Sequence, residues 1–156
     1  MTKELKFAPR ELFVQMLEYM AIPTFDLVIE YGNQGIIIVH RKIAPYKDVW
    51  ALPGLRMFKG ENIDDTLIRI AKQEVGLNID TKDKIILGQY VGKFKTEHER
   101  QDISTGYLVK VSDDQEIYLN QDHFYSHRIT TSIPENMGAM YKYYLNQYFQ
   151  MRNETD

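Results

Sequence analysis

The stretch from Trp50 to Leu77 constrains the fold most, because its residues specify a strand end, a tight turn and a helix in succession. Pro53-Gly54 ends the strand, since Pro lacks the N–H that a sheet needs and Gly adopts backbone angles that other residues resist. Asn62 and Asp65 are typical of a helix N-cap with a capping box, and Gly76 is typical of a helix C-cap. The stretch therefore predicts a strand, a loop and a capped helix.

The predicted helix has an apolar face and a polar face. The apolar residues recur at spacings of three and four, at Ile63, Leu67, Ile70, Ala71 and Val75. The polar residues include Asp64, Asp65, Arg69 and Lys72. Carbonyl groups of the preceding loop are expected beside the helix side chains, and this arrangement suits a hard divalent cation held against phosphate oxygens.

This unit resembles the signature of the Nudix hydrolase superfamily, GX5EX7REUXEEXGU, preceded by a W-x-L-P-G segment. The positions that agree with the signature are Glu61, Arg69, Glu74, Gly76 and Leu77. The positions that differ are Leu55, in place of the first Gly, and Ile70 and Gln73, in place of two Glu. The resemblance implies the α/β Nudix fold, in which a mixed β-sheet is sandwiched between α-helices.

Loss of the same two Glu residues marks the GDP-mannose mannosyl hydrolases, and the resemblance to that group runs from about Leu12 to Leu77. Those enzymes hydrolyse the sugar C1–O bond of a GDP-hexose, with a single Mg²⁺ assisting the departure of GDP. Their pattern of polar residues is met here by Asp26, Arg41, Gly54, Arg56, Arg69 and Glu74. The resemblance implies that Asp26, Arg41, Arg56 and Arg69 bind the substrate.

A second polar segment, from Asn120 to Thr130, contains two histidines. In the resembling group a Gln-His pair in this loop supplies a metal ligand and the general base. Alignment places Asp122 on the Gln and His123 on the His. A carboxylate binds Mg²⁺ at least as well as an amide oxygen, and imidazole takes up a proton near neutral pH. His127 is the alternative base.

The predicted function is a Mg²⁺-dependent nucleotide-sugar hydrolase that converts GDP-mannose or a related GDP-hexose to GDP and free sugar. The Gly54 carbonyl, Glu74 and Asp122 would hold one Mg²⁺, with Mn²⁺ as an alternative ion. Arg41 and Arg56 would stabilise the charge that grows on departing GDP. One carboxylate on the helix carries too little negative charge for several cations, so a single ion is expected.

Two other functions are consistent with the same residues. One is a Nudix pyrophosphatase that cleaves a phosphorus–oxygen bond with carboxylates from elsewhere, such as Glu97 or Glu99. The other is a non-catalytic nucleotide-binding module, in which the changed signature positions record lost activity. Leu55 favours this module, because a bulky side chain beside Gly54 crowds the carbonyl that the metal needs.

Structural roles are the simpler alternatives for two of the charged residues. Arg69 can pair with Glu61 and brace the loop against the helix. The segments 24–31 and 35–41 are strand-like around a Gly-rich turn, and a symmetric hairpin would place Asp26 opposite Arg41 as a cross-strand ion pair. The remaining elements are expected as a helix over 9–20, strands over 84–91 and 104–111, and a helix over 134–151.

Composition excludes several classes of protein. The chain has 156 residues, of which 44% are hydrophobic, and this favours a single domain over residues 1–156. A net charge of −3 gives no general attraction to nucleic acid, and the absence of cysteine excludes disulfides and thiol catalysis. No apolar run is long enough for a membrane span or a secretory signal. A cytoplasmic protein is expected, and the family resemblance implies a homodimer.

Overall fold

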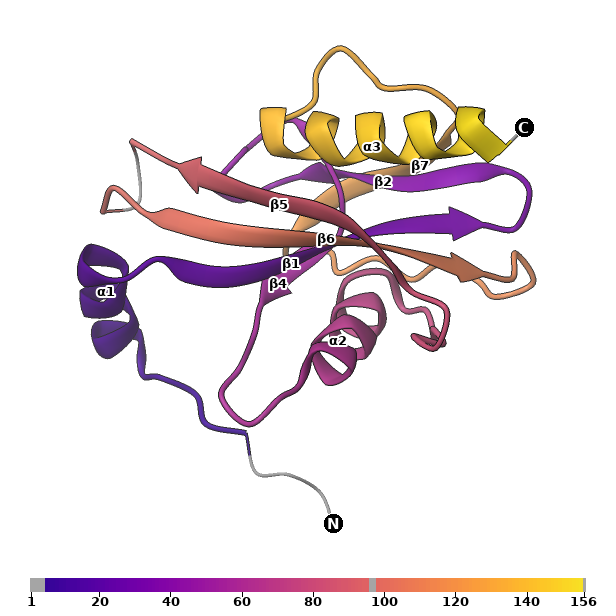
Figure 1. Cartoon of the computed structure of the whole chain (residues 1–156). Coiled ribbons are helices and arrows are strands. Elements are labelled where there is room, and N and C mark those ends of the chain that lie inside the picture. The colour runs from indigo at the N-terminus through magenta and orange to yellow at the C-terminus, as the bar shows by residue number, and fades with distance from the viewer. Residues whose placement is uncertain (1–4, 96–97, 156) are drawn as a thin grey trace.

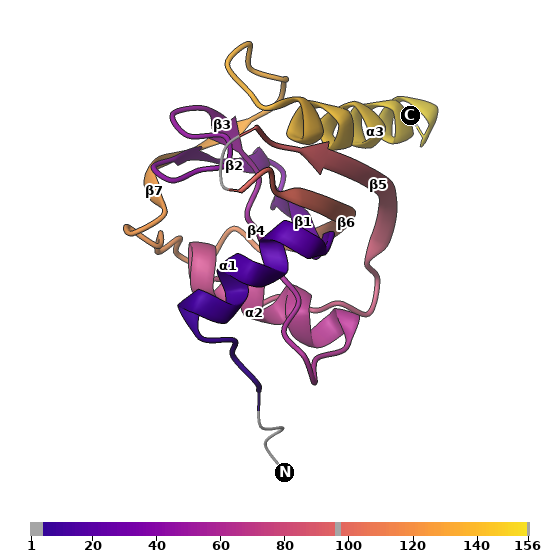
Figure 2. The same ribbon diagram turned by 90° about the vertical axis from the view of Figure 1, so that its left-hand side faces the viewer.

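The computed structural model describes residues 5–95 and 98–155, and its fold is a mixed α/β arrangement, as predicted. The helices are α1 (Arg10–Tyr19), α2 (Ile63–Val75) and α3 (Ala139–Thr155). The strands are β1 (Ile22–Tyr31), β2 (Gly35–Arg41), β3 (Trp50–Ala51), β4 (Gly54–Arg56), β5 (Ile85–Lys93), β6 (Gln101–Val111) and β7 (Phe124–Thr130). Figure 1 labels most of these elements, and Figure 2 adds β3.

One mixed sheet forms the middle layer, in the order β3-β2-β1-β6-β5, with β4 also pairing with β1 and β7 with β2. β1 and β6 run parallel from Ile22, opposite Asp102, to Tyr31, opposite Val111. The other strand pairs are antiparallel. Helix α3 covers one face, α2 covers the other, and α1 lies beside the start of β1 (Figures 1 and 2).

The central strands are apolar on both faces because helices cover both sides of the sheet. In β1 the consecutive residues Leu27, Val28 and Ile29 have no exposed surface, and neither have residues 36–39 of β2. Such strands lose the alternation of apolar and polar residues that a half-exposed sheet shows. The polar groups buried among them, Asp26 above all, therefore require a specific explanation.

The register of the β1–β2 hairpin differs by one residue from the prediction. The observed pairs are Tyr31 with Gly35 and Glu30 with Ile36. The predicted pairing of Asp26 with Arg41 is therefore wrong. The two strands also part soon after the turn, because the short strand β4 pairs with β1 and places Gly54 opposite Asp26. The strand that follows the Pro-Gly turn thus pairs with β1, and a prediction based on the hairpin alone does not include it.

Helix α2 has the predicted ends, whereas α3 is shifted. The Asn62 side chain accepts from the Asp65 N–H, the Asp65 side chain accepts from the Asn62 N–H, and Gly76 adopts a left-handed φ of 71°. These contacts confirm the capping box and the C-cap. Helix α3 begins at Ala139 and not near Pro134, and ends at Thr155. Within the described ranges, the helices are too short or too polar to cross a bilayer.

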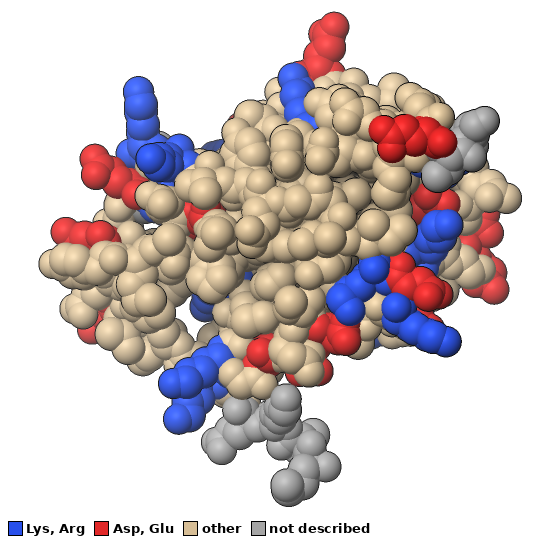
Figure 3. All heavy atoms as spheres, in the orientation of Figure 1, with Lys and Arg blue, Asp and Glu red and all other residues tan. Residues whose placement is uncertain are grey.

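The surface seen in the orientation of Figure 1 is mostly uncharged across its middle (Figure 3). Lys and Arg lie mixed with Asp and Glu towards its rim, and on this face they do not gather into one broad basic patch. Four arginines gather instead in a cavity.

Candidate active site

A cavity of about 530 Å³ opens between α1, the carboxyl end of β2, β4 and the start of α3. Its charged and titratable lining residues are Arg10, Asp26, Arg41, Arg56, His98, Arg100, Asp102 and His123. Four arginines against two aspartates make its lining cationic. A cavity of this size and charge suits a small, anionic, phosphate-bearing molecule.

Asp26 lies at the floor of the cavity, on β1, and is only 4% exposed. Its Oδ2 accepts a hydrogen bond of 2.5 Å from the Ser104 hydroxyl on β6, and Ser104 in turn accepts one of 2.8 Å from Tyr144 on α3. Burial raises the pKa of Asp26 to about 7, against the lowering effects of Ser104 and Arg41. Burial thus favours the neutral form of this carboxyl group.

Gly54 is required by its closeness to Asp26. A Cβ atom at position 54 would lie 2.1 Å from Asp26 Oδ1, a distance no real side chain tolerates. The glycine of the Pro-Gly turn therefore serves the site as well as the turn, because it lets the backbone of β4 pass directly against the carboxylate. Leu55, which follows it, is partly buried and packs against the core.

Arg41 lines the cavity from the end of β2, and its side chain is held by the loop that follows. Its Nε donates to the carbonyl oxygens of Ile43 and Pro45 at 3.2 and 2.7 Å, and its Nη2 donates to Ala44 at 3.4 Å. None of these bonds uses Nη1. Arg41 is therefore a buried, oriented cation with donor capacity left for a ligand in the cavity.

Arg56 lies on β4, and its guanidinium stacks over the ring of Phe13 at 4.1 Å and near that of Phe58 at 5.3 Å. Burial lowers its pKa from the ordinary value, and the positive charges of Arg100 and Arg69 lower it further. Arg56 and Arg100 both line the cavity, and an anion that enters it relieves the repulsion between them. The α1 residue Phe13 thus holds Arg56 at the wall of the cavity.

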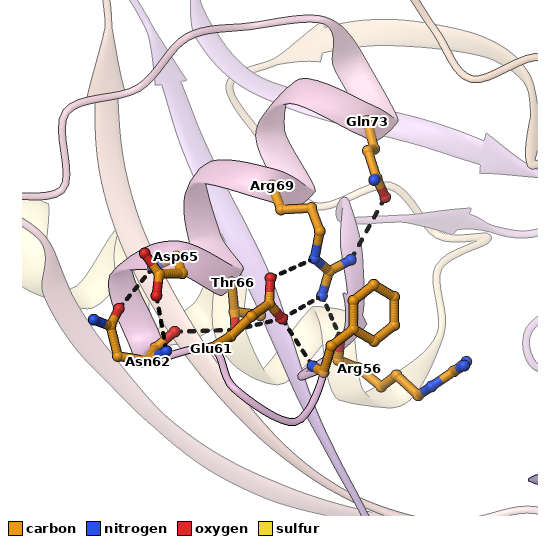
Figure 4. Close-up of polar contacts among 8 residues, drawn as sticks. Arg56, Glu61, Asn62, Asp65, Thr66, Arg69 and Gln73 are labelled. Atoms are coloured by element: carbon orange, nitrogen blue, oxygen red, sulfur yellow. Dashed lines mark hydrogen bonds and ion pairs between the residues drawn. The ribbon is translucent and has the colours of Figure 1, made fainter. Parts of the chain in front are cut away.

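Arg69 is bound within the protein and does not line the cavity. Its Nε and Nη2 donate to the two carboxylate oxygens of Glu61 at 2.7 and 3.0 Å, and Nη2 also donates to the Arg56 carbonyl at 2.7 Å. Figure 4 shows this cluster, in which the Arg56 side chain points away from Glu61. The expected brace between loop and helix is present, and substrate binding by Arg69 finds no support.

Glu74 is the one acidic side chain of the signature helix that is fully buried, with 1% exposure. Its two carboxylate oxygens lie 2.9 and 3.0 Å from His123 Nδ1. This hydrogen bond raises the pKa of His123 above its ordinary value, although burial acts against it. His123 lines the cavity, and its contacts leave Nε2 unused. Glu74 and His123, which were predicted for the same site, are thus in direct contact.

Asp122 does not join this pair. It is exposed and outside the cavity, and the residue beside Glu74 is instead Asn120, whose Nδ2 lies 3.4 Å from Glu74 Oε1 and 3.2 Å from His123 Nδ1. The His123 N–H donates to the Asn120 carbonyl, so the segment is a turn in which residues three apart share a side. The expected ligand role of Asp122 therefore loses its geometric basis.

The carboxylates proposed for a pyrophosphatase are not gathered at the site either. Glu99 is exposed and does not line the cavity, and Glu97 lies outside the described residues. Ile70, which stands where the signature has Glu, has no exposed surface and packs in the core. Gln73 contacts Arg69 Nη1 at 3.5 Å. The helix therefore offers Glu74 alone to a cation.

A single divalent cation fits this donor set, and a multi-metal cluster does not. Over the described ranges, no three His, Asp or Glu side chains are close enough to hold an ion by themselves. Mg²⁺ commonly keeps several waters and binds through one or two carboxylates plus substrate phosphates. The Glu74 carboxylate has lone pairs beyond those facing His123, and would bind one ion only in company with a phosphate.

Sequence reasoning missed the charged lining residues Arg10, Arg100 and Asp102, and it also missed Ser104, Asn120 and Tyr141 in the cavity and its surroundings. Asn120 lies in the segment already singled out, two residues before Asp122, so an alignment slip of two would have found it. Ser104 and Tyr141 carried no such signal, because one opens a predicted strand and the other is one of several aromatic residues on an amphipathic helix.

A family model, the NUDIX domain, matches residues 20–130. The chain belongs to the Nudix family. A solved structure of similar fold is the MutT NUDIX hydrolase from Burkholderia pseudomallei, with 18% identity, a TM-score of 0.72, and coverage of 82% of this chain and 98% of that one. Nudix hydrolases use divalent metal ions and act on nucleoside diphosphate derivatives. The predicted fold is thereby confirmed.

Two curated relatives match parts of the Nudix chain. The low-salt glycan biosynthesis protein Agl8 of Haloferax volcanii is 24% identical over 95 residues, which cover 61% of this chain and 56% of Agl8. The ADP-ribose pyrophosphatase of Methanocaldococcus jannaschii is 38% identical over 65 residues, which cover 42% of this chain and 37% of that enzyme. The chain thus matches about half or less of each relative's length.

Proposed function

We propose that this Nudix protein hydrolyses a nucleotide sugar, GDP-mannose or a related GDP-hexose, at the bond between the anomeric carbon and the diphosphate. The observation that carries the proposal is the contact of the buried Glu74 carboxylate with His123, which itself lines the arginine-rich cavity. One buried carboxylate beside a histidine suits a single Mg²⁺ and a general base. It does not suit the several cations that attack at phosphorus requires on an acid-rich helix.

The roles of the residues follow from their contacts. When bound, the cation supplies electrostatic stabilisation of the departing diphosphate, with Glu74 and the Gly54 carbonyl as its protein ligands. Arg41 Nη1 and the Arg56 guanidinium would bind phosphate oxygens, where the charge grows as the bond to the sugar breaks. Both side chains are already oriented, Arg41 by loop carbonyls and Arg56 by Phe13.

His123 would act as the general base. A neutral imidazole that donates through Nδ1 to the Glu74 carboxylate presents Nε2 as an acceptor towards the cavity. Nε2 takes a proton from water, the water oxygen bonds to the anomeric carbon, and the electron pair of the broken bond stays on the β-phosphate oxygen of GDP. Water and GDP-hexose thus give GDP, free hexose and the proton on His123, which then passes to solvent.

The pyrophosphatase alternative is favoured by one observation, the 38% identity to an ADP-ribose pyrophosphatase over 65 residues. Isotope labelling separates the two reactions. The protein is incubated with Mg²⁺ in ¹⁸O-labelled water, once with GDP-mannose and once with ADP-ribose, and the products are analysed by mass spectrometry. Cleavage at carbon places ¹⁸O in free mannose, whereas cleavage at phosphorus places it in a phosphate. Label in phosphate, or turnover of ADP-ribose alone, would overturn the proposal.

Three further expectations stay predictions: Mg²⁺ as the ion, with Mn²⁺ as the alternative, the cytoplasmic location expected from composition, and the homodimer implied by the family resemblance. The first is checked within the same assay by replacing Mg²⁺ with Mn²⁺ at equal concentration. The dimer is checked by the molar mass of the protein in solution, measured by light scattering after size-exclusion chromatography.

A further inference from the structure

Helix α3 directs three tyrosines at the sheet, Tyr141, Tyr144 and Tyr148, spaced three and four residues apart. Residues at this spacing share one face of a helix. All three are buried, with 3%, 0% and 3% exposure. A buried tyrosine hydroxyl normally has a hydrogen-bond partner, because leaving it unpaired away from water is costly.

Two of the three hydroxyls have such a partner within the fold. Tyr144 donates to the Ser104 hydroxyl at 2.8 Å, and Tyr148 donates to Glu30 Oε2 at 2.6 Å. Tyr141 makes no side-chain hydrogen bond to any residue of the described ranges, and its ring packs against Tyr46 with centroids 5.0 Å apart. It is also the only one of the three that lines the cavity. The unpaired hydroxyl therefore belongs to the site.

Other polar atoms of the cavity wall lack partners in the same way. The Thr24 hydroxyl is buried and unpaired among the described residues, and Thr24 lies two residues before Asp26, on the same face of β1. Asp26 has a bonded Oδ2, but its Oδ1 has no partner there. The Tyr141 hydroxyl and Asp26 Oδ1, a donor and an acceptor without protein partners, suit a ligand that carries hydroxyl groups, whereas the Thr24 oxygen is buried too deeply to reach it.

We propose that Tyr141 is a specificity-determining residue whose hydroxyl hydrogen-bonds a hydroxyl group of the hexose, an inference that rests on the proposed function. The assignment to sugar and not phosphate follows from the neighbours. Asp26 Oδ1 in the same cavity can accept a hydrogen bond from a sugar hydroxyl, whereas an ionised phosphate oxygen has none to donate, and the apolar side chains of Phe94 and Met140 suit the C–H face of a sugar. Burial raises the pKa of Tyr141, so the hydroxyl keeps its proton.

The test is calorimetric titration in metal-free buffer, so that the nucleotide sugar is bound but not turned over. GDP-mannose and GDP are each titrated into the wild type, Tyr141→Phe and the matched control Tyr148→Phe. Tyr141→Phe should bind GDP-mannose about tenfold more weakly and GDP as the wild type does, because a single neutral hydrogen bond to the sugar is lost. Tyr148→Phe should bind both ligands unchanged.

Thermal unfolding of the same variants gives the opposite pattern. Tyr148→Phe loses a bond to a charged partner and should unfold at a lower temperature, whereas Tyr141→Phe loses no bond within the free protein and should unfold as the wild type does. If Tyr141→Phe binds GDP-mannose as the wild type does, or weakens GDP equally, the inference is wrong while the proposed function stands. If the wild type releases no labelled mannose in the ¹⁸O assay, the proposed function fails and the inference fails with it.

Discussion

The two glutamates of the Nudix signature, Glu61 and Glu74, are both buried, yet their surroundings differ. The Glu61 carboxylate accepts from Arg69 at 2.7 and 3.0 Å, from the Phe58 N–H at 2.8 Å and from the Thr66 hydroxyl at 3.2 Å. Its acceptor capacity is filled by the protein. Its main partner, a guanidinium, stays charged throughout the physiological range.

Glu74 has fewer and weaker partners. Its carboxylate faces His123, which is charged only when protonated, and an Asn120 amide at 3.4 Å. A buried carboxylate with lone pairs to spare and no permanent positive partner can accept a cation, whereas one saturated by arginine cannot. The comparison teaches that burial does not identify the functional glutamate. The character of the partner separates the two, because Glu61 is bonded into the fold by an arginine and Glu74, which faces a histidine, is the one proposed to hold the cation.

The largest expected effect is on catalysis at Glu74. Glu74→Gln keeps the size of the side chain but removes the charge that holds the cation. The rate of GDP-mannose hydrolysis should fall about 10³-fold, the scale of several kcal/mol of lost electrostatic stabilisation, and should no longer respond to added Mg²⁺. Steady-state kinetics over a Mg²⁺ series measures this. A variant that keeps its rate and its Mg²⁺ dependence would show that Glu74 is structural, like Glu61.

The second effect should fall on stability at Arg69. Arg69→Met keeps a side chain of similar length but removes the guanidinium, whose carbon lies 3.7 Å from the centre of the Phe58 ring, and leaves the Glu61 charge buried without its main partner. The free energy of unfolding in urea should drop by about 3 kcal/mol. The double variant with Glu61→Gln should lose less than the two single changes together, because no isolated charge remains. Additive losses would contradict a coupled pair.

The third expected effect is on kcat, and it distinguishes His123 from His127 as the general base. His123→Ala should lower kcat about 10²-fold, the usual contribution of a general base, while the Mg²⁺ concentration for half-maximal rate stays similar. His127→Ala is the matched control, because His127 lies four residues later on β7, is exposed and does not line the cavity. Its kinetics should match those of the wild type. If His127→Ala loses kcat and His123→Ala does not, His127 is the base, and the contact of Glu74 with His123 has no catalytic role.

The contrast between the glutamates also shows what the sequence could predict. The ends of α2 follow from local chemistry, because Asn62, Asp65 and Gly76 act on their own backbone neighbours. The pairing of Glu61 with Arg69 joins one loop to the helix that follows it, and it could be predicted from the sequence for the same reason. Features whose partners are near in sequence are determined by short-range rules.

Features that depend on distant segments were not predictable in this way. The β1–β2 register failed because β4 competes for the same edge of β1, which no hairpin rule includes. Alignment placed Asp122 at the site, but the turn brings Asn120 to Glu74, and no local sequence rule predicts which residue of that turn faces the helix. The role proposed for Tyr141 depends on its hydroxyl having no hydrogen-bond partner in the sheet. Helical spacing predicts which face of α3 is buried, but it does not show which hydroxyl on that face is unpaired.

The smallest expected effect is the pH dependence of the unfolding free energy, which tests the ion pair between Glu61 and Arg69. Burial raises the pKa of Glu61, but Arg69, the Phe58 N–H and Thr66 together lower it below its ordinary value of 4.5. Above pH 4.5 the group is ionised in both folded and unfolded chains, so its contribution to stability is fully present. As the pH falls below 4.5 the unfolded chain takes up the proton first, and the contribution is lost progressively towards the folded pKa.

This linkage is checked by urea unfolding at a series of pH values from about 3 to about 7, which includes the range in which carboxylates titrate. The difference in unfolding free energy between wild type and Arg69→Met should be constant near neutral pH and should narrow below 4.5, because protonated Glu61 no longer needs the guanidinium. A constant difference down to pH 3 would mean that Arg69 stabilises the fold through its stacking on Phe58 alone. In that case Glu61 would be no more committed to the fold than Glu74, and the distinction between the two would rest on catalysis only.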